Sequence, residues 1–227
     1  MEKYTILSNE SVPRNAQGNA ERFLANDVIA FYHEDYHGGT GNYKKEGTIE
    51  NLICTFKNDV TRYTETVLQS AMNRLEAILQ TDLPEILRES KYTTLRVCVV
   101  PRAKNERHYQ DNQRLFRKTV QWIVKNTHGL EDGTHDILRH TDTATTHLSR
   151  GCYVSEGRFP YIGITKDTCD ISDSVSGKDI LLIDDLYTKT VNIDEDCIQA
   201  LFDKGARSVI FYSVGKTVHK TRAGLNV

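Results

Sequence analysis

The stretch 180–194 constrains the fold of this chain most, because it joins a buried strand to an acidic pair, a turn and a helix start. Four apolar residues, 180–183, precede Asp184 and Asp185, and a polar turn follows before the helix begins. In open α/β sheets, ligands bind at the carboxyl end of such a strand. Carboxylates there accept hydrogen bonds from hydroxyls and bind hard cations, which suits a ribose diol or a Mg²⁺-bound phosphate. The turn at a helix N-terminus suits a phosphate group.

Strands alternate with helices from residue 95 onward, which predicts an α/β fold with a mostly parallel sheet. Asn192 is the expected N-cap of the helix after the acidic pair, Glu195 completes a capping-box-like pair, and Gly205 is expected at the C′ position. The region 129–157 carries little apolar periodicity and is expected to be a long loop. The strands are expected at 95–100, 161–165, 180–183 and 208–214, and the helices at about 110–126 and 193–204.

The N-terminal region is harder to interpret. Val28–Tyr32 and Leu52–Phe56 are predicted strands, and apolar residues at three- to four-residue spacing predict a helix over 59–89. Pro84 is expected to break that helix or to start a second short one. His33 and His37 have the spacing of a helix-borne metal pair. Their neighbours favour a strand and a loop, so a coincidental polar segment is the preferred interpretation.

Composition indicates an ordinary globular protein. The 227 residues carry 29 basic and 31 acidic side chains, so the net charge of −2 gives no global electrostatic reason to expect nucleic-acid binding. No apolar run approaches the roughly 18–20 residues of a membrane span. The N-terminus lacks the apolar core of a signal peptide, and the five cysteines are scattered without a Cys-x-x-Cys pair. We therefore expect a cytoplasmic location.

The stretch 180–194 resembles the ribose-phosphate-binding signature of type I phosphoribosyltransferases. In that family, four apolar residues precede an acidic pair, which is followed by x-x-Thr-Thr-Gly-x-Thr. The acidic pair and Thr188 match this pattern. Lys189 stands where a second Thr is usual, Thr190 where Gly is usual, and Asn192 where the last Thr is usual.

Further matches point to the ComF-like branch of the family, in the expected order along the chain. Asn112 and Gln113 are similar to the Asn-Gln that opens a helix in that branch, after a basic loop. Leu148-Ser149-Arg150 resembles part of the mobile loop that closes over the active site there. The zinc-binding module of many ComF-like proteins is absent, because its cysteines are missing.

The resemblance implies a type I phosphoribosyltransferase-like fold, with a parallel sheet flanked by helices. It covers about 95–217, so we expect a phosphoribosyltransferase-like core at 95–227. Residues 1–94 would form an N-terminal hood or helical region that packs on this core and is not independent. In the family such a hood recognises the nitrogenous acceptor, which the sequence does not identify.

The resemblance also implies a reaction and its site residues. The protein would bind 5-phosphoribosyl-1-pyrophosphate (PRPP) with Mg²⁺, transfer the phosphoribosyl group to a nitrogen acceptor of nucleotide metabolism and release pyrophosphate. Asp184 and Asp185 would hold the ribose hydroxyls, directly or through Mg²⁺. The 5-phosphate would be bound by Thr188, Lys189, Thr190, Val191 and Asn192, the pyrophosphate by Arg102, Ala103 and Lys104, and the closing loop would carry His147, Ser149 and Arg150.

Two other functional classes remain open from the sequence. One is a non-catalytic module that senses PRPP or another nucleotide, or binds a partner through the same pocket, for example in a DNA-uptake or defence system. The other is a hydrolase of glycosidic bonds, in which water replaces the acceptor. As protein partners, the resemblance suggests a second copy of the chain or other components of a bacterial multi-component system.

Overall fold

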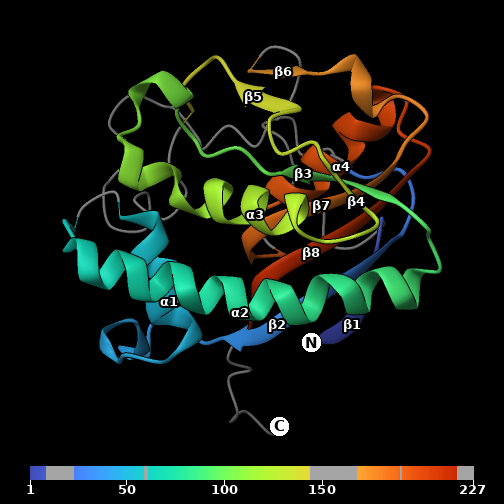
Figure 1. Cartoon of the computed structure of the whole chain (residues 1–227). Coiled ribbons are helices and arrows are strands. Elements are labelled where there is room, and N and C mark those ends of the chain that lie inside the picture. Colours follow the sequence, from blue (N-terminus) through green and yellow to red (C-terminus); the bar gives the residue numbers. More distant parts are fainter. Residues whose placement is uncertain (9–22, 59–60, 144–167, 190, 219–227) are drawn as a thin grey trace, which may run out of the picture.

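A six-stranded, mostly parallel sheet forms the centre of the structure (Figure 1). The computed structural model describes residues 1–8, 23–58, 61–143, 168–189 and 191–218. The strand order is β1-β2-β8-β7-β3-β4, in which β1 is antiparallel to β2 and the other neighbours are parallel. A separate antiparallel pair joins β5 to β6. The strands are β1 (Glu2–Ile6), β2 (Val28–Tyr36), β3 (Leu95–Val99), β4 (Leu130–Asp132), β5 (Ile137–Arg139), β6 (Cys169–Ile171), β7 (Asp179–Tyr187) and β8 (Ser208–Thr217).

Helices cover both faces of this sheet (Figure 1). The helices α1 (Ile49–Lys57), α2 (Glu65–Ser90) and α3 (Leu115–Lys125) share one apolar cluster with the sheet, and α4 (Ile193–Asp203) shares the other. Both faces of β7 are therefore buried, which explains its continuous apolar run. Short 3₁₀ helices are η1 (Asn42–Lys44), η2 (Glu106–His108), η3 (Asp111–Arg114) and η4 (Asp173–Val175).

The structure confirms the predicted alternation of strands and helices in the core. The expected strands at 95–100, 180–183 and 208–214 correspond to β3, β7 and β8, and the expected helices correspond to α3 and α4. Gly205 has a φ of 96° after α4, as expected of a C′ glycine, and its N–H donates to the carbonyl of Phe202. The predicted strand at 161–165 lies outside the described residues.

The region 52–56 is helical, so the strand predicted there is wrong. It belongs to α1, whose N-cap Thr48 accepts a hydrogen bond from the N–H of Asn51 at 3.2 Å. Ile49, Ile53 and Phe56 recur at helical spacing and are buried in the cluster on the α1 face. The short apolar run is compatible with either a strand or a helix, and the N-cap upstream of it favours the helix.

Two further expectations are corrected by the structure. Helix α2 continues through Pro84 to Ser90 without a break. Burial of Leu79, Leu83 and Ile86 on either side of the proline offsets its cost of about 3 kcal/mol in a helix interior. The region 129–157 is not wholly a loop, because β4 and β5 lie within it.

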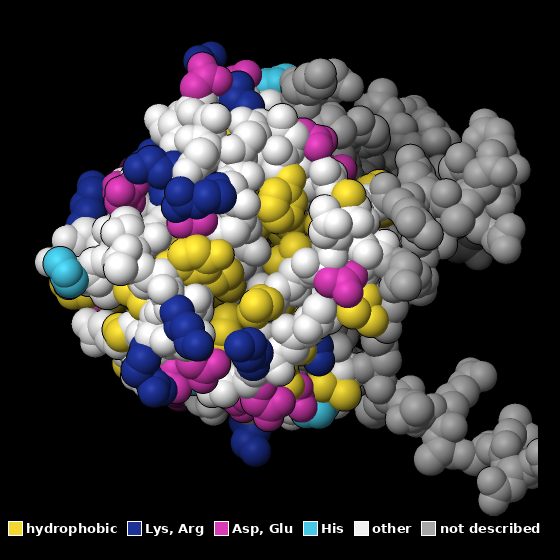
Figure 2. Space-filling model, turned by 90° about the vertical axis from the view of Figure 1, so that its right-hand side faces the viewer, with side chains coloured by type: hydrophobic (Ala, Val, Ile, Leu, Met, Phe, Trp, Pro, Cys, Tyr) yellow, Lys and Arg dark blue, Asp and Glu magenta, His cyan; other side chains and the backbone are white. Residues whose placement is uncertain are grey.

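Residues from the N-terminal region form part of the same sheet as the core. Strand β2 pairs in parallel with β8, with Ala30 beside Phe211 and Tyr32 beside Ser213. Strand β1 then forms the antiparallel edge. In the part of the chain that the structure describes, no helix has the length and apolarity needed to cross a membrane. On the face shown in Figure 2, Lys and Arg side chains are interspersed with Asp and Glu side chains around apolar ones.

Candidate functional site

The acidic pair lies within β7, near its carboxyl end. The strand continues to Tyr187 and does not end at Ile183 as predicted. Leu182 and Tyr187 belong to the α4 cluster, whereas Ile183 and Leu186 contact the α1 cluster, so simple strand alternation does not extend across the acidic pair. Contacts place the two carboxyl groups instead, because Asp185 lies beside Lys57 of α1 and Asp184 beside Asp194 of α4.

Asp185 is paired with Lys57, the last residue of α1. Their Nζ and Oδ1 atoms are 3.1 Å apart, and both side chains are partly exposed. Burial lowers the pKa of Lys57, but Asp185 and Asp184 outweigh this effect and raise the pKa above its usual value. The ammonium group thus stays charged beside the acidic pair.

Asp184 interacts with a third carboxyl group, that of Asp194 in the first turn of α4. Burial, followed by the charge of Asp185, raises the pKa of Asp184 to about 7. Burial and the neighbouring Asp184 also raise the pKa of Asp194 well above its usual range. The N–H of Asp185 donates to Asp184 Oδ1 at 2.7 Å and fixes the carboxyl orientation. A carboxyl that keeps its proton near neutral pH can donate as well as accept hydrogen bonds.

The segment predicted to bind phosphate forms a turn between β7 and α4. The N–H of Val191 donates to the carbonyl of Thr188 at 2.9 Å, and the Thr188 hydroxyl lies 2.7 Å from that of Thr217 on β8. Lys189 is partly exposed in this turn, and Thr190 lies outside the described residues. The turn leads directly into the N-terminus of α4, where backbone N–H groups are available to an anion.

The predicted capping role of Asn192 is wrong. Its backbone is left-handed, with a φ of 57°, and its side chain makes no capping hydrogen bond. Glu195 does not complete a capping box either, since its Oε1 accepts a hydrogen bond from the Tyr187 hydroxyl at 2.8 Å. Positions with a left-handed backbone are usually occupied by Gly or Asn. The left-handed turn, and not a capping role at the helix start, therefore explains why an asparagine stands here.

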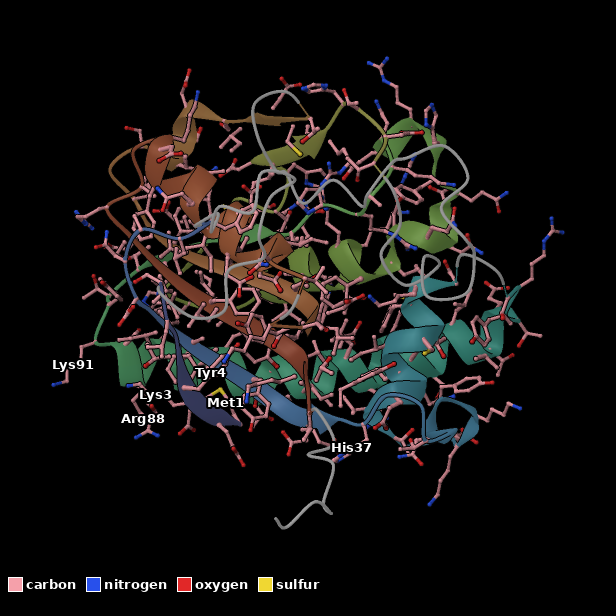
Figure 3. All side chains as sticks on the ribbon, turned by 180° about the vertical axis from the view of Figure 1, so that it is seen from behind. Met1, Lys3, Tyr4, His37, Arg88 and Lys91 are labelled. Carbon is pink, nitrogen blue, oxygen red and sulfur yellow. The ribbon has the colours of Figure 1, made fainter. Side chains whose placement is uncertain are left out.

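Three buried polar atoms at the start of α4 lack a hydrogen-bond partner among the described residues, namely Asn192 Nδ2, Asp194 Oδ1 and Glu195 Oε2. Asn192 and Glu195 line a small cavity of about 20 Å³ together with Tyr187. A volume of roughly 10–15 Å³ holds one water, which can satisfy such groups. Tyr4 of β1, labelled in Figure 3, packs its ring 5.6 Å from that of Tyr187 on this side of the sheet.

The predicted pyrophosphate loop begins beside the acidic pair. The N–H of Val100 donates to the carbonyl of Ile183 at 2.9 Å, so the chain leaving β3 starts level with Asp184. Lys104 is exposed on this loop. Its N–H donates to the Tyr109 hydroxyl at 2.8 Å, and the carbonyl of Ala103 accepts from the N–H of Thr143 at 2.7 Å.

Arg102 joins this loop to helix α1. Its guanidinium donates to the carbonyls of Phe56 at 3.1 Å and Gln113 at 2.9 Å, and also to that of Lys57. It lies 4.8 Å from the centre of the Tyr109 ring. Arg102 therefore holds the end of α1, and with it Lys57, against the loop that follows β3.

The structure brings the acidic pair, the turn and the loop after β3 to the same edge of the sheet. His147, Ser149 and Arg150 lie outside the described residues. Sequence reasoning missed Lys57 and Asp194. The signal for Lys57 was the helical spacing of α1, and the signal for Asp194 was its place in the first turn of α4.

The histidine pair at 33 and 37 has a structural explanation. His33 Nδ1 lies 2.9 Å from Asp82 Oδ2, which also accepts a hydrogen bond from Tyr212 at 2.8 Å. Within the described residues, no group of three or more His, Cys, Asp or Glu side chains is arranged to hold a metal ion. The acidic pair offers two carboxylates, which suits Mg²⁺ bound jointly with substrate phosphates and water. The donor set thus fits Mg²⁺ in that shared form.

Comparisons with protein-family models and with curated proteins find no match to this chain. The geometry of the site therefore carries the functional argument alone.

Proposed function

We propose that the protein binds PRPP with Mg²⁺ at the carboxyl edge of β7 and transfers its phosphoribosyl group to a nitrogen acceptor, releasing pyrophosphate. The observation that carries the proposal is the arrangement of three segments at one edge. Asp184 and Asp185 end the buried part of β7, the turn after them enters α4, and the loop after β3 begins beside Ile183. A ribose with phosphates at two positions requires such an acidic centre between two anion sites.

Each part of the edge has a role in this proposal. The acidic pair accepts hydrogen bonds from the ribose hydroxyls, and the turn 188–192 presents backbone N–H groups to the 5-phosphate. Lys104 and Lys189 add positive charge on the pyrophosphate and 5-phosphate sides. Mg²⁺ held by the substrate and the acidic pair would supply positive charge for the pyrophosphate leaving group. The chain itself contributes mainly by positioning the reacting groups and stabilising charge.

Lys57 gives the site a feature that the resemblance does not supply. Its ammonium group is held on Asp185 at 3.1 Å, where it competes with a ribose hydroxyl or Mg²⁺ for that carboxylate. For PRPP and Mg²⁺ to bind, either the ion pair between Lys57 and Asp185 must break, or Asp185 must contact the ligand and Lys57 at the same time. Replacement of Lys57 by Met should therefore change the Mg²⁺ dependence of PRPP binding.

The direct test is calorimetric titration of PRPP into the purified protein, with and without Mg²⁺. We expect Mg²⁺-dependent binding that is lost in the double variant Asp184→Asn with Asp185→Asn. The matched control is Asp170→Asn with Asp203→Asn, which changes the charge equally at exposed positions. Normal PRPP binding by the Asp184/Asp185 variant, with the fold shown intact by circular dichroism, would refute the site assignment.

A second measurement separates transfer from the two other classes. The protein is incubated with PRPP, Mg²⁺ and a panel of nitrogen bases and amines, and the products are followed by phosphorus NMR. Acceptor-dependent pyrophosphate supports transfer. Ribose 5-phosphate without an acceptor points to hydrolysis, and tight binding without turnover points to a sensing module.

A further inference from the structure

A separate cavity of about 210 Å³ lies beneath the segment that joins β3 to α3. Its volume is more than ten times the roughly 10–15 Å³ that one water needs, so it has room for an organic molecule. Val99 and Val100 form part of its wall at the end of β3, and the rings of Tyr109 and Phe116 add aromatic surface. The remaining lining residues are Arg102, Glu106, Arg114, Arg117, Lys118 and His135.

The charges around this cavity are unbalanced. Arg102, Arg114, Arg117 and Lys118 are cationic, and Glu106 is the carboxylate among the described lining residues, which leaves an excess of three positive charges (four minus one). The net charge of the whole chain is −2, so this concentration of cations is local. Clefts lined by one sign of charge attract ligands of the opposite sign.

Arg117 and Glu106 form the most buried contact of the cavity. Arg117 is 9% exposed, and its Nη1 is ion-paired with Glu106 Oε1, while Nη2 lies 3.5 Å from the carbonyl of Ile137. Burying a guanidinium is costly unless a carboxylate accompanies it. Glu106 is 31% exposed in its side chain and can turn away from the pair when another anion replaces it.

Arg114 and Lys118 have donors that a ligand could use. Arg114 donates from Nη2 to the carbonyl of Glu106 at 2.7 Å, but its buried Nε has no hydrogen-bond partner among the described residues. Lys118 Nζ donates to Asp111 Oδ1 at 3.4 Å, which uses one of its three N–H donors. The cavity therefore combines charged donors on one side with aromatic and aliphatic surface on the other.

We propose that this cavity is a second ligand site, which takes a small aromatic carboxylate. The carboxylate would replace Glu106 as the partner of Arg117 and accept from Arg114, and the ring would pack between Tyr109 and Phe116. Bidentate binding of a planar carboxylate is what an arginine provides best. Its lining includes Val100 and Arg102 of the loop after β3 but neither residue of the acidic pair.

The test uses benzoate as the probe, titrated into the full-length protein by calorimetry. Benzamide is the control that keeps the ring without the charge, and inorganic phosphate keeps the charge without the ring. We expect saturable benzoate binding below about 10 mM and benzamide binding at least about tenfold weaker, as loss of one charged hydrogen bond predicts. Phosphate should also bind more weakly than benzoate, because it makes no contact with the aromatic surface. Equal affinity for benzoate and benzamide, or no saturable benzoate binding, would overturn the proposal.

Variants of the lining residues test whether benzoate binds in this cavity. Glu106→Gln removes the competing carboxylate and should strengthen benzoate binding. The double variant Glu106→Gln with Arg117→Gln removes both partners, so no buried charge is left alone, and it should lose benzoate binding while still unfolding cooperatively. Unchanged affinity in the double variant would also overturn the proposal.

Two lysines on the same helix provide a matched comparison. Lys118 lines the cavity and lies 3.4 Å from Asp111, whereas Lys125 lies 3.5 Å from Asp132 and does not line it. Their side chains are 51% and 59% exposed. Lys118→Gln should weaken benzoate binding and Lys125→Gln should not. Weakening by both variants to the same extent would show a general charge effect and contradict the cavity site.

The test is independent of the proposed function. The Asp184→Asn with Asp185→Asn variant should retain benzoate binding even if it loses PRPP. Conversely, the protein can fail to bind PRPP and still bind benzoate, because none of the cavity contacts described above involves the acidic pair.

Discussion

Asp194 is a buried carboxyl group whose charge is disfavoured at neutral pH. It is 4% exposed, and burial and Asp184 raise its pKa well above the usual range. A group whose pKa is higher in the folded state favours folding in acid, and this contribution falls as the pH rises through the folded-state pKa. The carboxyl should therefore destabilise the protein on the alkaline side, as is frequent where residues serve a ligand.

We expect Asp194→Asn to stabilise the protein at pH 8 by about 1–3 kcal/mol, the usual cost of an uncompensated buried polar group. At pH 5, where the raised pKa favours the protonated carboxyl more than at pH 8, the gain should be smaller. Urea unfolding at the two pH values measures the difference, with Asp203→Asn at the exposed far end of α4 as the control. An equal gain at both pH values would contradict the charge explanation.

Asn192 allows a test of the turn that precedes α4. Its φ of 57° favours glycine, and an alanine there would cost about 1–2 kcal/mol because its Cβ approaches the backbone carbonyl. We expect Asn192→Ala to lower the free energy of unfolding and Asn192→Gly to lower it less. Thermal unfolding of both variants gives the comparison. Equal stability of the two would mean that the residue is not left-handed in solution.

At the scale of elements, Gly215 on β8 sets how closely α1 approaches the sheet. A Cβ at this position would lie 2.6 Å from Cδ1 of Ile53 and 3.2 Å from Cδ1 of Leu186. Ile53 is 1% exposed, so it has no free space to move into. The close approach places the end of α1, and therefore Lys57, beside the acidic pair.

Gly215→Ala should destabilise the protein by about 1–3 kcal/mol through overpacking. Gly38→Ala is the control, because the nearest atom to its added Cβ would be 3.6 Å away. Ile53→Val in the Gly215→Ala background should recover part of the loss, which a double-mutant cycle of urea unfolding detects. Additive losses would show that Ile53 does not cause the clash.

The elements also show which features the sequence predicts. The existence of the strand at 180–183 and of the helix after it is predicted correctly, because the apolar run is continuous and Gly205 marks the helix end, but the strand extends to Tyr187. The run 52–56 is too short to distinguish strand from helix by its own periodicity, and the Thr48 cap and the packing of α1 distinguish them. For the same reason Lys57 was not expected beside Asp185, since that contact depends on the packing of α1. Asn192 has a residue type that fits both a cap and a left-handed turn, so its role could not be read from its identity.

At the scale of the whole molecule, the N-terminal region supplies β2 to the sheet and α1 and α2 to one of its faces. We expect a fragment of residues 95–227 to aggregate, because it exposes the edge of β8 and the apolar surface beneath two helices. A chain that begins at residue 24 loses only β1 and its link and should still fold. Size-exclusion chromatography and circular dichroism compare the two. A monomeric fragment 95–227 that unfolds cooperatively would contradict this expectation.

The place of β8 in the strand order affects how the protein forms during translation. Strand β2 leaves the ribosome well before its parallel partner β8, which is the last strand of the described chain. Until β8 emerges, β2 and β7 both lack their shared neighbour, and the nascent chain carries two unpaired strand edges. Completion of the sheet therefore waits until β8 has been synthesised, and a premature stop before β8 leaves a chain that depends on chaperones or is degraded.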